Sequence, residues 1–174
     1  MTQRSERALF LIGFMGCGKT TVGAIVAERL GWRFADTDAL VEAREQRSIE
    51  RIFHESGEGH FREAEWRALQ SICDVARIVV ATGGGLYLGR VQRGLMRAAG
   101  TTMWLDAALP IVRARLAAST GRPLWGTGDP LAQRAFFEKR RAIYALADAR
   151  IDAGTGSPDE VAARVIARFL PLFH

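Results

Sequence analysis

A glycine-rich run near the start of the chain carries residues that could bind phosphate. The run Gly13–Thr20 reads GFMGCGKT and fits the pattern G-x-x-x-x-G-K-[ST]. In this pattern backbone N–H groups surround the phosphates, the lysine reaches the β- and γ-phosphates, and the final hydroxyl binds Mg²⁺. The chain has 24 lysines and arginines, and Lys19 and Lys139 are the two lysines among them. Because arginine supplies almost all the other basic residues, a lysine at position 19 indicates a need for a compact ammonium group rather than a planar guanidinium.

The elements expected beside this run are those that a phosphate-binding loop requires. Residues 8–12 are apolar and predict a buried strand, and residues 21–30 have apolar positions at helical spacing. The glycines then lie at a helix N-terminus, where free N–H groups and the helix dipole favour an anion. The sequence therefore predicts a nucleotide-binding loop, and a turn that only links two elements is the weaker alternative.

The length and composition of the chain suit one globular domain. With 174 residues, 48% of them hydrophobic, it can bury one sizeable core, so we expect a single domain over residues 1–174. No apolar run approaches the ~18 residues of a membrane span, and the polar residues 1–7 do not resemble a secretion signal. Two cysteines, Cys17 and Cys73, make no disulfide framework. We therefore expect a cytoplasmic protein that does not contact a membrane.

The charge of the chain leaves more than one class of partner open. A net charge of +5 and an isoelectric point near 10.0 are compatible with nucleic-acid binding. However, the arginines are scattered among acidic residues, and no patch of basic and aromatic residues is present. A positive field would equally attract ATP and a small anionic substrate. We therefore expect no nucleic-acid partner. The three histidines show no spacing typical of metal ligands.

Strand-like and helical segments alternate along the chain, which predicts a parallel sheet with helices on both faces. A loop rich in Gly, Thr and Pro at residues 119–129 has the length of a lid. Ser157 and Glu160 form a capping box ahead of a final helix. Proline residues at 110, 130 and 158 are placed for the first turns of helices. The expected strands are residues 8–12, 33–36, 78–82, 101–105 and 150–152.

The carboxyl ends of the first three strands carry polar or glycine residues, and ligands gather at this edge of such sheets. Asp36 and Asp38 follow the second strand, and Gly83–Gly85 follows the third, where a backbone without side chains allows close approach. Each segment alone could be an ordinary turn. Their convergence beside the phosphate-binding loop favours a binding site.

Two helical segments carry an arginine beside a residue that could position it. Arg62, Glu65 and Trp66 share one face of a helix expected over about residues 59–77. Glu65 could hold the Arg62 guanidinium for an anion, or the two could form a surface ion pair of little consequence. Arg140 and Tyr144 share a face in residues 136–149, with the same two interpretations.

In their order and spacing these motifs resemble the shikimate kinase family over nearly the whole chain. The family patterns F-x-D-T-D, S-I-x-x-I-F, G-E and F-R-x-x-E match segments that begin at Phe34, Ser48, Gly57 and Phe61. The triple glycine, Arg-Pro-Leu at residues 122–124 and R-x-x-x-Y at residues 140–144 follow. The phosphate-binding loop alone occurs in many families, whereas this series is much more specific.

The resemblance implies an α/β, three-layer P-loop NTPase fold of the nucleoside-monophosphate-kinase type, with a five-stranded parallel sheet. It also implies a substrate-binding region at about residues 36–65 and a lid at about residues 119–129. The implied reaction is Mg²⁺-dependent transfer of the ATP γ-phosphoryl group to the 3-hydroxyl of shikimate, in aromatic amino-acid biosynthesis. The family tends to be monomeric.

The resemblance also assigns roles to individual residues. The implied catalytic residues are Lys19, Asp38, as base, and Arg122, which would close over the phosphates. The implied ATP-binding residues are Gly16, Cys17, Gly18, Lys19, Thr20, Thr21, Arg115, Arg122 and Pro158. The implied shikimate-binding residues are Asp38, Arg62, Gly84, Gly85 and Arg140. Thr20 would bind Mg²⁺ directly and Asp36 through water.

Two other functions stay open on the sequence. A small-molecule kinase of the same fold, such as a gluconate kinase, would also use an anionic polyol as acceptor. A nucleotide-dependent module that binds nucleic acid would explain the high isoelectric point, and its binding would weaken steeply with salt.

Overall fold

The computed structural model describes residues 8–118 and 129–173. The predicted lid at residues 119–129, with Arg122, lies outside these residues except for Asp129. The five strands are β1 (Ala8–Ile12), β2 (Arg33–Asp36), β3 (Ile78–Ala81), β4 (Gly100–Asp106) and β5 (Ala149–Asp152). The helices are α1 (Lys19–Leu30), α2 (Thr37–Glu45), α3 (Ile49–Ile72), α4 (Arg90–Ala99), α5 (Leu109–Ala117), α6 (Pro130–Tyr144) and α7 (Pro158–Phe173), with a short 3₁₀ helix η1 (Leu86–Leu88).

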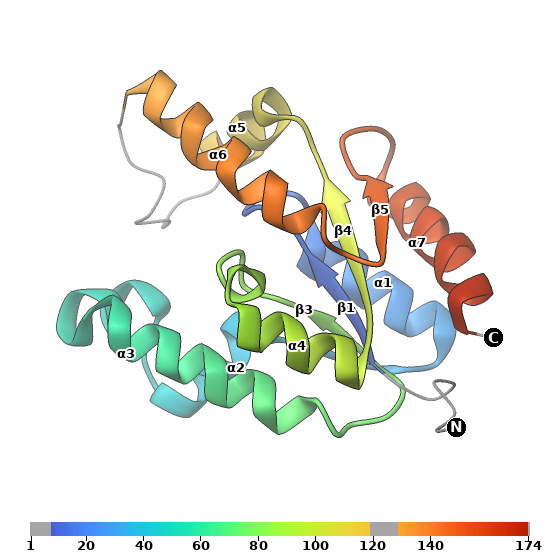
Figure 1. Cartoon of the computed structure of the whole chain (residues 1–174), viewed down its shortest axis with the longest axis horizontal. Helices are drawn as coiled ribbons and strands as arrows, with labels where there is room; N and C mark the ends of the chain where they lie inside the picture. Colours follow the sequence, from blue (N-terminus) through green and yellow to red (C-terminus); the bar gives the residue numbers. More distant parts are fainter. Residues whose placement is uncertain (1–7, 119–128, 174) are drawn as a thin grey trace.

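The strands form one parallel sheet in the order β2-β3-β1-β4-β5. All five residues of β1 are buried, because β1 lies at the centre of the sheet with a strand on each side and helices cover both faces. Helices α1 and α7 pack together on one face, and α4 covers the other. Figure 1 shows α3 and α6 extending from the rest of the molecule. The predicted α/β fold with a five-stranded parallel sheet is confirmed.

Most predicted strands agree with the structure to within one residue at each end, and the differences concern helices. The helix expected at about residues 59–77 is the second part of α3, which begins at Ile49 and ends at Ile72. Helix α6 begins at Pro130, and residues 145–148, which we expected to be helical, follow its last turn. The capping box is confirmed, since Ser157 N donates to Glu160 Oε2 and Glu160 N donates to Ser157 Oγ.

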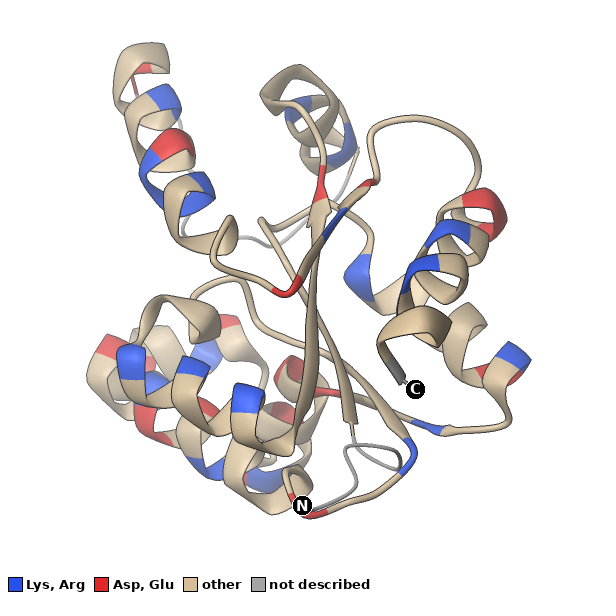
Figure 2. Cartoon of the chain, turned by 45° about the vertical axis from the view of Figure 1, so that its right-hand side comes forward, with Lys and Arg blue, Asp and Glu red and all other residues tan. Residues whose placement is uncertain are grey.

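Among the described residues, charges of a single sign occur on two helices: α4 carries three arginines and α5 two, and neither carries an acidic residue (Figure 2). Basic and acidic positions occur together on most helices that the structure describes. No helix in residues 8–118 or 129–173 is long and apolar enough to cross a membrane.

Helix α3 contains a kink at Gly57, whose φ of 80° and ψ of 173° are not helical. Such a backbone conformation is essentially restricted to glycine. The kink divides α3 into a first part that carries Glu50 and Phe53 and a second part that carries Phe61 and Arg62. Residues from both parts line the same pocket, described below. Gly57 therefore lets one segment of chain form two walls of that pocket.

We predict that Gly57→Ala lowers the free energy of unfolding by about 1–3 kcal/mol, because alanine is strained in this conformation. Gly59→Ala is the matched control, since an added Cβ at either position meets no atom within 4 Å. In a helical conformation the change at Gly59 should instead raise stability by about 0.5–1 kcal/mol. Urea unfolding of both variants measures the difference, and equal effects would contradict the assigned backbone strain.

Candidate functional site

The phosphate-binding loop borders a pocket of about 260 Å³ at the carboxyl ends of the strands. The N-terminus of α1 opens into this pocket, with Gly18 in a left-handed conformation before Lys19. The side chain of Cys17 is buried and does not line the pocket. The pocket is lined by Met15, Gly16, Gly18, Lys19, Thr20, Thr21, Asp36, Asp38, Thr82, Gly84, Arg115 and Leu116.

Lys19 is folded back onto its own loop. Its ammonium group donates hydrogen bonds of 2.9 Å to the carbonyl oxygens of Gly13 and Phe14, and only 9% of the residue is exposed. These contacts hold the charge beside the loop N–H groups, where a phosphate would be attracted to both. The ammonium group is therefore positioned for an anion in the pocket.

Thr20 and Asp36 both line this pocket and lie in direct contact. Thr20 Oγ1 donates a 2.6 Å hydrogen bond to Asp36 Oδ2. The other carboxylate oxygen of Asp36 accepts from the backbone N–H of Asp38, at 2.9 Å, and caps α2. A hydroxyl and a carboxylate are oxygen donors of the kind that Mg²⁺ prefers. In the described residues no cluster of three or more His, Cys, Asp or Glu could form a metal site by itself, so a metal here would also need ligands from a nucleotide or water.

Arg115 connects the phosphate-binding loop with the segment after β5. One of its guanidinium nitrogens lies 3.4 Å from the carbonyl oxygens of both Gly16 and Cys17, and the other donates to Ala153 O at 3.1 Å. Pro158 begins α7 at the end of that segment and is exposed. Pro158 does not line the pocket itself.

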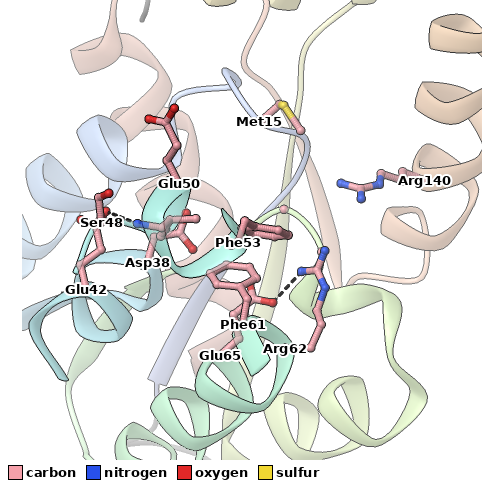
Figure 3. Close-up of a pocket in the computed structure, with 14 residues that line it drawn as sticks. Met15, Asp38, Glu42, Ser48, Glu50, Phe53, Phe61, Arg62, Glu65 and Arg140 are labelled. Carbon is pink, nitrogen blue, oxygen red and sulfur yellow. Dashed lines mark hydrogen bonds and ion pairs between the residues drawn. The ribbon is translucent and has the colours of Figure 1, made fainter. Parts of the chain in front are cut away.

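A second pocket, of about 270 Å³, adjoins the first. Met15, Asp38 and Gly84 line both pockets and so form their common wall. Figure 3 shows Arg62 and Arg140 on one side, Glu42, Ser48 and Glu50 on the other, and Phe53 and Phe61 between them. The second pocket is lined by Met15, Asp38, Glu42, Ser48, Ile49, Glu50, Phe53, Phe61, Arg62, Glu65, Gly83, Gly84, Gly85 and Arg140.

Charged side chains approach the backbone of the triple glycine closely at Gly83 and Gly85. A Cβ at Gly83 would run into Glu65 Oε1 and would lie 2.7 Å from Asp38 Oδ1. A Cβ at Gly85 would run into Arg62 Nη1. These separations are shorter than van der Waals contact, so any side chain at either position would displace the charged groups. The segment does form a turn, since Leu86 N donates to Gly83 O at 3.1 Å, and this turn lies among the charged side chains of the pocket.

Arg62 is held by a carboxylate beneath it. Its Nη1 donates to Glu65 Oε2 at 2.6 Å, and its Nη2 donates to the more exposed Glu58 at 3.0 Å. Glu65 is 1% exposed, and this burial raises the pKa of its carboxyl group to about 7. The Arg62 and Arg140 charges oppose the rise, and Asp38 adds to it. The interpretation of a merely exposed surface ion pair is wrong.

Arg140 enters the same pocket from α6. It is 8% exposed, and a Cβ added at Gly84 would lie 3.7 Å from its Nη1. The two arginines therefore approach the glycine segment from different helices, at adjacent residues. Together they form a cationic wall that suits a carboxylate, while Asp38 faces the phosphate-binding pocket.

Comparison with known proteins agrees with this arrangement. A sequence profile described as shikimate kinase matches residues 15–170. The shikimate kinase of Trichormus variabilis is 41% identical over 164 residues, which cover 94% of this chain and 90% of that protein. The chain belongs to the shikimate kinase family. The predicted family, fold class and kinase activity are thus confirmed.

Solved structures support the same assignment. The shikimate kinase from Acinetobacter baumannii in complex with shikimate has a TM-score of 0.90 and 29% identity, and the match covers 97% of this chain and 96% of that chain. A gluconokinase from Sinorhizobium meliloti has a TM-score of 0.61 and 18% identity, with 97% and 94% of the two chains covered. At this low identity, the similarity to the gluconokinase shows a shared fold but not a shared activity.

The sequence analysis singled out Tyr144 beside Arg140, but it missed the role of Thr37 in this shikimate kinase family site. Thr37 Oγ1, fully buried, accepts from Gly83 N at 2.8 Å, and Tyr144 Oη donates to Gly84 O at 2.5 Å. Helices α2 and α6 thus hold the glycine segment from two sides. Thr37 lies inside the D-T-D motif, which could have identified it. Met15 lies in the phosphate-binding loop, and Glu42 and Phe53 lie in the region expected at about residues 36–65, but none of the three was singled out as a lining residue.

The raised pKa of Glu65 predicts a measurable pH dependence of stability. Between pH 4.5 and about 7 the folded chain keeps a proton on Glu65 that the unfolded chain has lost. The free energy of unfolding should therefore fall as the pH rises through this window, by about 3 kcal/mol from this group. Glu65→Gln removes the titration, so the stability of the wild type relative to this variant should decline over the window. Urea unfolding at several pH values checks it, and a difference that does not change with pH would contradict the burial argument.

Proposed function

We propose that this chain transfers the γ-phosphoryl group of ATP to the 3-hydroxyl of shikimate, giving shikimate 3-phosphate and ADP, in the route to chorismate. The observation that carries the proposal is the wall shared by the two pockets. Because Asp38 and Gly84 border both, a phosphoryl group in one and a hydroxyl in the other would meet at Asp38. Positioning and charge neutralisation supply most of the catalysis in phosphoryl transfer.

On the nucleotide side, the loop N–H groups and Lys19 would bind the β- and γ-phosphates. The ammonium group would exchange the carbonyl oxygens of Gly13 and Phe14 for phosphate oxygens, which offer more negative charge. Thr20 would hold Mg²⁺ directly and Asp36 through water, and the ion would neutralise phosphate charge when bound. Arg115 and Pro158 would border the adenine. The ATP-binding set is Gly16, Cys17, Gly18, Lys19, Thr20, Thr21, Arg115, Arg122 and Pro158.

On the acceptor side, Arg62 and Arg140 would bind the carboxylate of shikimate and thereby direct its hydroxyls toward Asp38. The Asp38 carboxylate would accept a hydrogen bond, and then the proton, from the 3-hydroxyl as its oxygen attacks the γ-phosphorus. The exposed backbone of Gly84 and Gly85 would contact the ring, since no side chain intervenes. Two guanidinium groups and one carboxylate match an acid with hydroxyl groups better than they match a nucleobase.

The remaining assignments rest on the sequence and on family resemblance. Arg122 would close over the transferred phosphoryl group from a lid at about residues 119–129. The whole chain, residues 1–174, would act as one domain with a substrate-binding region at about residues 36–65. It would work as a cytoplasmic monomer that binds neither membrane nor nucleic acid.

An acceptor screen tests this proposal directly. The purified chain with ATP and Mg²⁺ should release ADP with shikimate and show at most background release with gluconate, as measured by a coupled ADP assay. Gluconate is the appropriate comparison because it is also an anionic polyol. Turnover with gluconate and none with shikimate would overturn the proposal, and salt-sensitive RNA binding without acceptor-dependent release would favour the nucleic-acid module.

A substitution at the shared wall tests the proposed base. Asp38→Asn keeps the shape of the side chain but removes the basic oxygen, so kcat should fall by about 10²- to 10⁴-fold. The affinity for ATP should change by less than about two-fold, because Lys19 and the loop N–H groups carry nucleotide binding in this proposal. Steady-state kinetics and nucleotide titration measure the two effects. A variant with near-normal kcat would exclude Asp38 as the base.

A further inference from the structure

Phe136 lies one helical turn before Arg140 on α6, and its ring is more exposed than its size and apolar character favour. The residue is 37% exposed, whereas the adjacent Phe137 is 1% exposed and belongs to the core. The guanidinium carbon of Arg140 lies 4.2 Å from the centroid of the Phe136 ring. One face of this ring is thus occupied by the charged group that the proposed function assigns to the acceptor carboxylate.

A ring of the phosphate-binding loop supports this contact. Phe14 lies edge-on to Phe136, with ring centroids 6.0 Å apart and an interplanar angle of 81°, and edge-on to Phe137 at 5.0 Å. The Arg140 guanidinium carbon is 5.8 Å from the Phe14 centroid. We name Phe14, Phe136 and Phe137 the aromatic seat. Contacts between a cation and ring faces strengthen when the cation is shielded from water, and Arg140 is 8% exposed.

The position of α6 itself is held by other contacts. Arg141 Nη2 donates to Asp106 Oδ2 at 2.8 Å, and the Arg141 guanidinium carbon is 5.4 Å from the ring centroid of Trp104. Asp106 and Trp104 are both buried at the end of β4. Arg141, the residue after Arg140, makes these contacts, and Phe136 takes no part in them. Loss of the Phe136 ring should therefore leave the helix in place and affect the Arg140 side chain.

We propose that Phe136 is a positioning residue that holds the Arg140 guanidinium toward the acceptor pocket, with Phe14 supporting it from the phosphate-binding loop. This inference rests on the proposed role of Arg140. A long arginine side chain loses rotamer freedom when it binds an anion, and a ring face that restricts it beforehand reduces that loss. Phe14 also accepts a hydrogen bond from Lys19 through its carbonyl oxygen. Phe14 thus contacts Lys19 through its backbone and the Phe136 and Arg140 side chains through its ring.

The test compares Phe136→Leu, which keeps an apolar side chain but removes the ring, with Phe136→Tyr, which keeps the ring. Phe136→Leu should weaken shikimate binding, measured by calorimetry without nucleotide, by about three- to ten-fold. The KM for shikimate should rise similarly, while the KM for ATP and kcat change by less than about two-fold. Phe136→Tyr should restore wild-type affinity. Leu131→Ala, at a 77% exposed position of the same helix, is the control and should change nothing.

A second background separates positioning from general structure. In Arg140→Gln, which lacks the cation, Phe136→Leu should have no further effect on the KM for shikimate. An equal loss in both backgrounds, a Tyr variant as weak as the Leu variant, or wild-type affinity in Phe136→Leu would each overturn the inference. Calorimetry requires no turnover, so a chain that binds shikimate without phosphorylating it would refute the proposed function and still test Phe136. A wild-type chain that does not bind shikimate would refute both.

Discussion

Residues 83–85 have no side chains, and three helices use the space that this leaves. Helix α2 brings Asp38 to this backbone, α3 brings Arg62 and Glu65, and α6 brings Arg140. Each approach is close enough that a Cβ on the glycine would contact or crowd the charged group. The same backbone is fixed by hydrogen bonds from Gly83 N to Thr37 and from Tyr144 to Gly84 O. The geometry of the acceptor pocket therefore depends on a steric constraint that is set at the end of β3.

The burial of ionisable side chains around the acceptor pocket shifts their pKa values. Glu65 is almost completely buried beneath Arg62, and burial raises the pKa of its carboxyl group to about 7. The same burial disfavours the charged form of Arg62, and the Glu65 and Glu58 carboxylates outweigh it, so the pKa of Arg62 is raised. Burial also raises the pKa of Tyr144 and keeps its hydroxyl a donor to Gly84 O. Arg62 therefore stays charged, whereas the protonation of Glu65 changes near pH 7.

The features predicted correctly from the sequence are those that depend on residues close together in the chain. The phosphate-binding loop follows from residue types at fixed spacing, and the strands follow from short apolar runs between helical segments. Since parallel strands end at the same edge, the convergence of Asp38 and Gly83–Gly85 also followed. The kink at Gly57 and the length of α3 did not, because an isolated glycine in a helical pattern does not disclose its φ. Thr37 and Met15 act through contacts with residues distant in sequence, which spacing alone does not reveal. Phe136 is only one helical turn from Arg140, but the ring that supports it, Phe14, is distant in sequence.

The central claim is that the γ-phosphoryl group and one hydroxyl of the acceptor meet at the wall formed by Asp38 and Gly84. The most direct measurement is the position of phosphate on the product, from ³¹P–¹H correlation NMR of the reaction with shikimate, ATP and Mg²⁺. The account predicts coupling of the phosphorus to the proton on carbon 3 alone. Phosphate on another hydroxyl, or on the carboxylate, would mean that the two arginines hold the acid in a different orientation and would contradict the account.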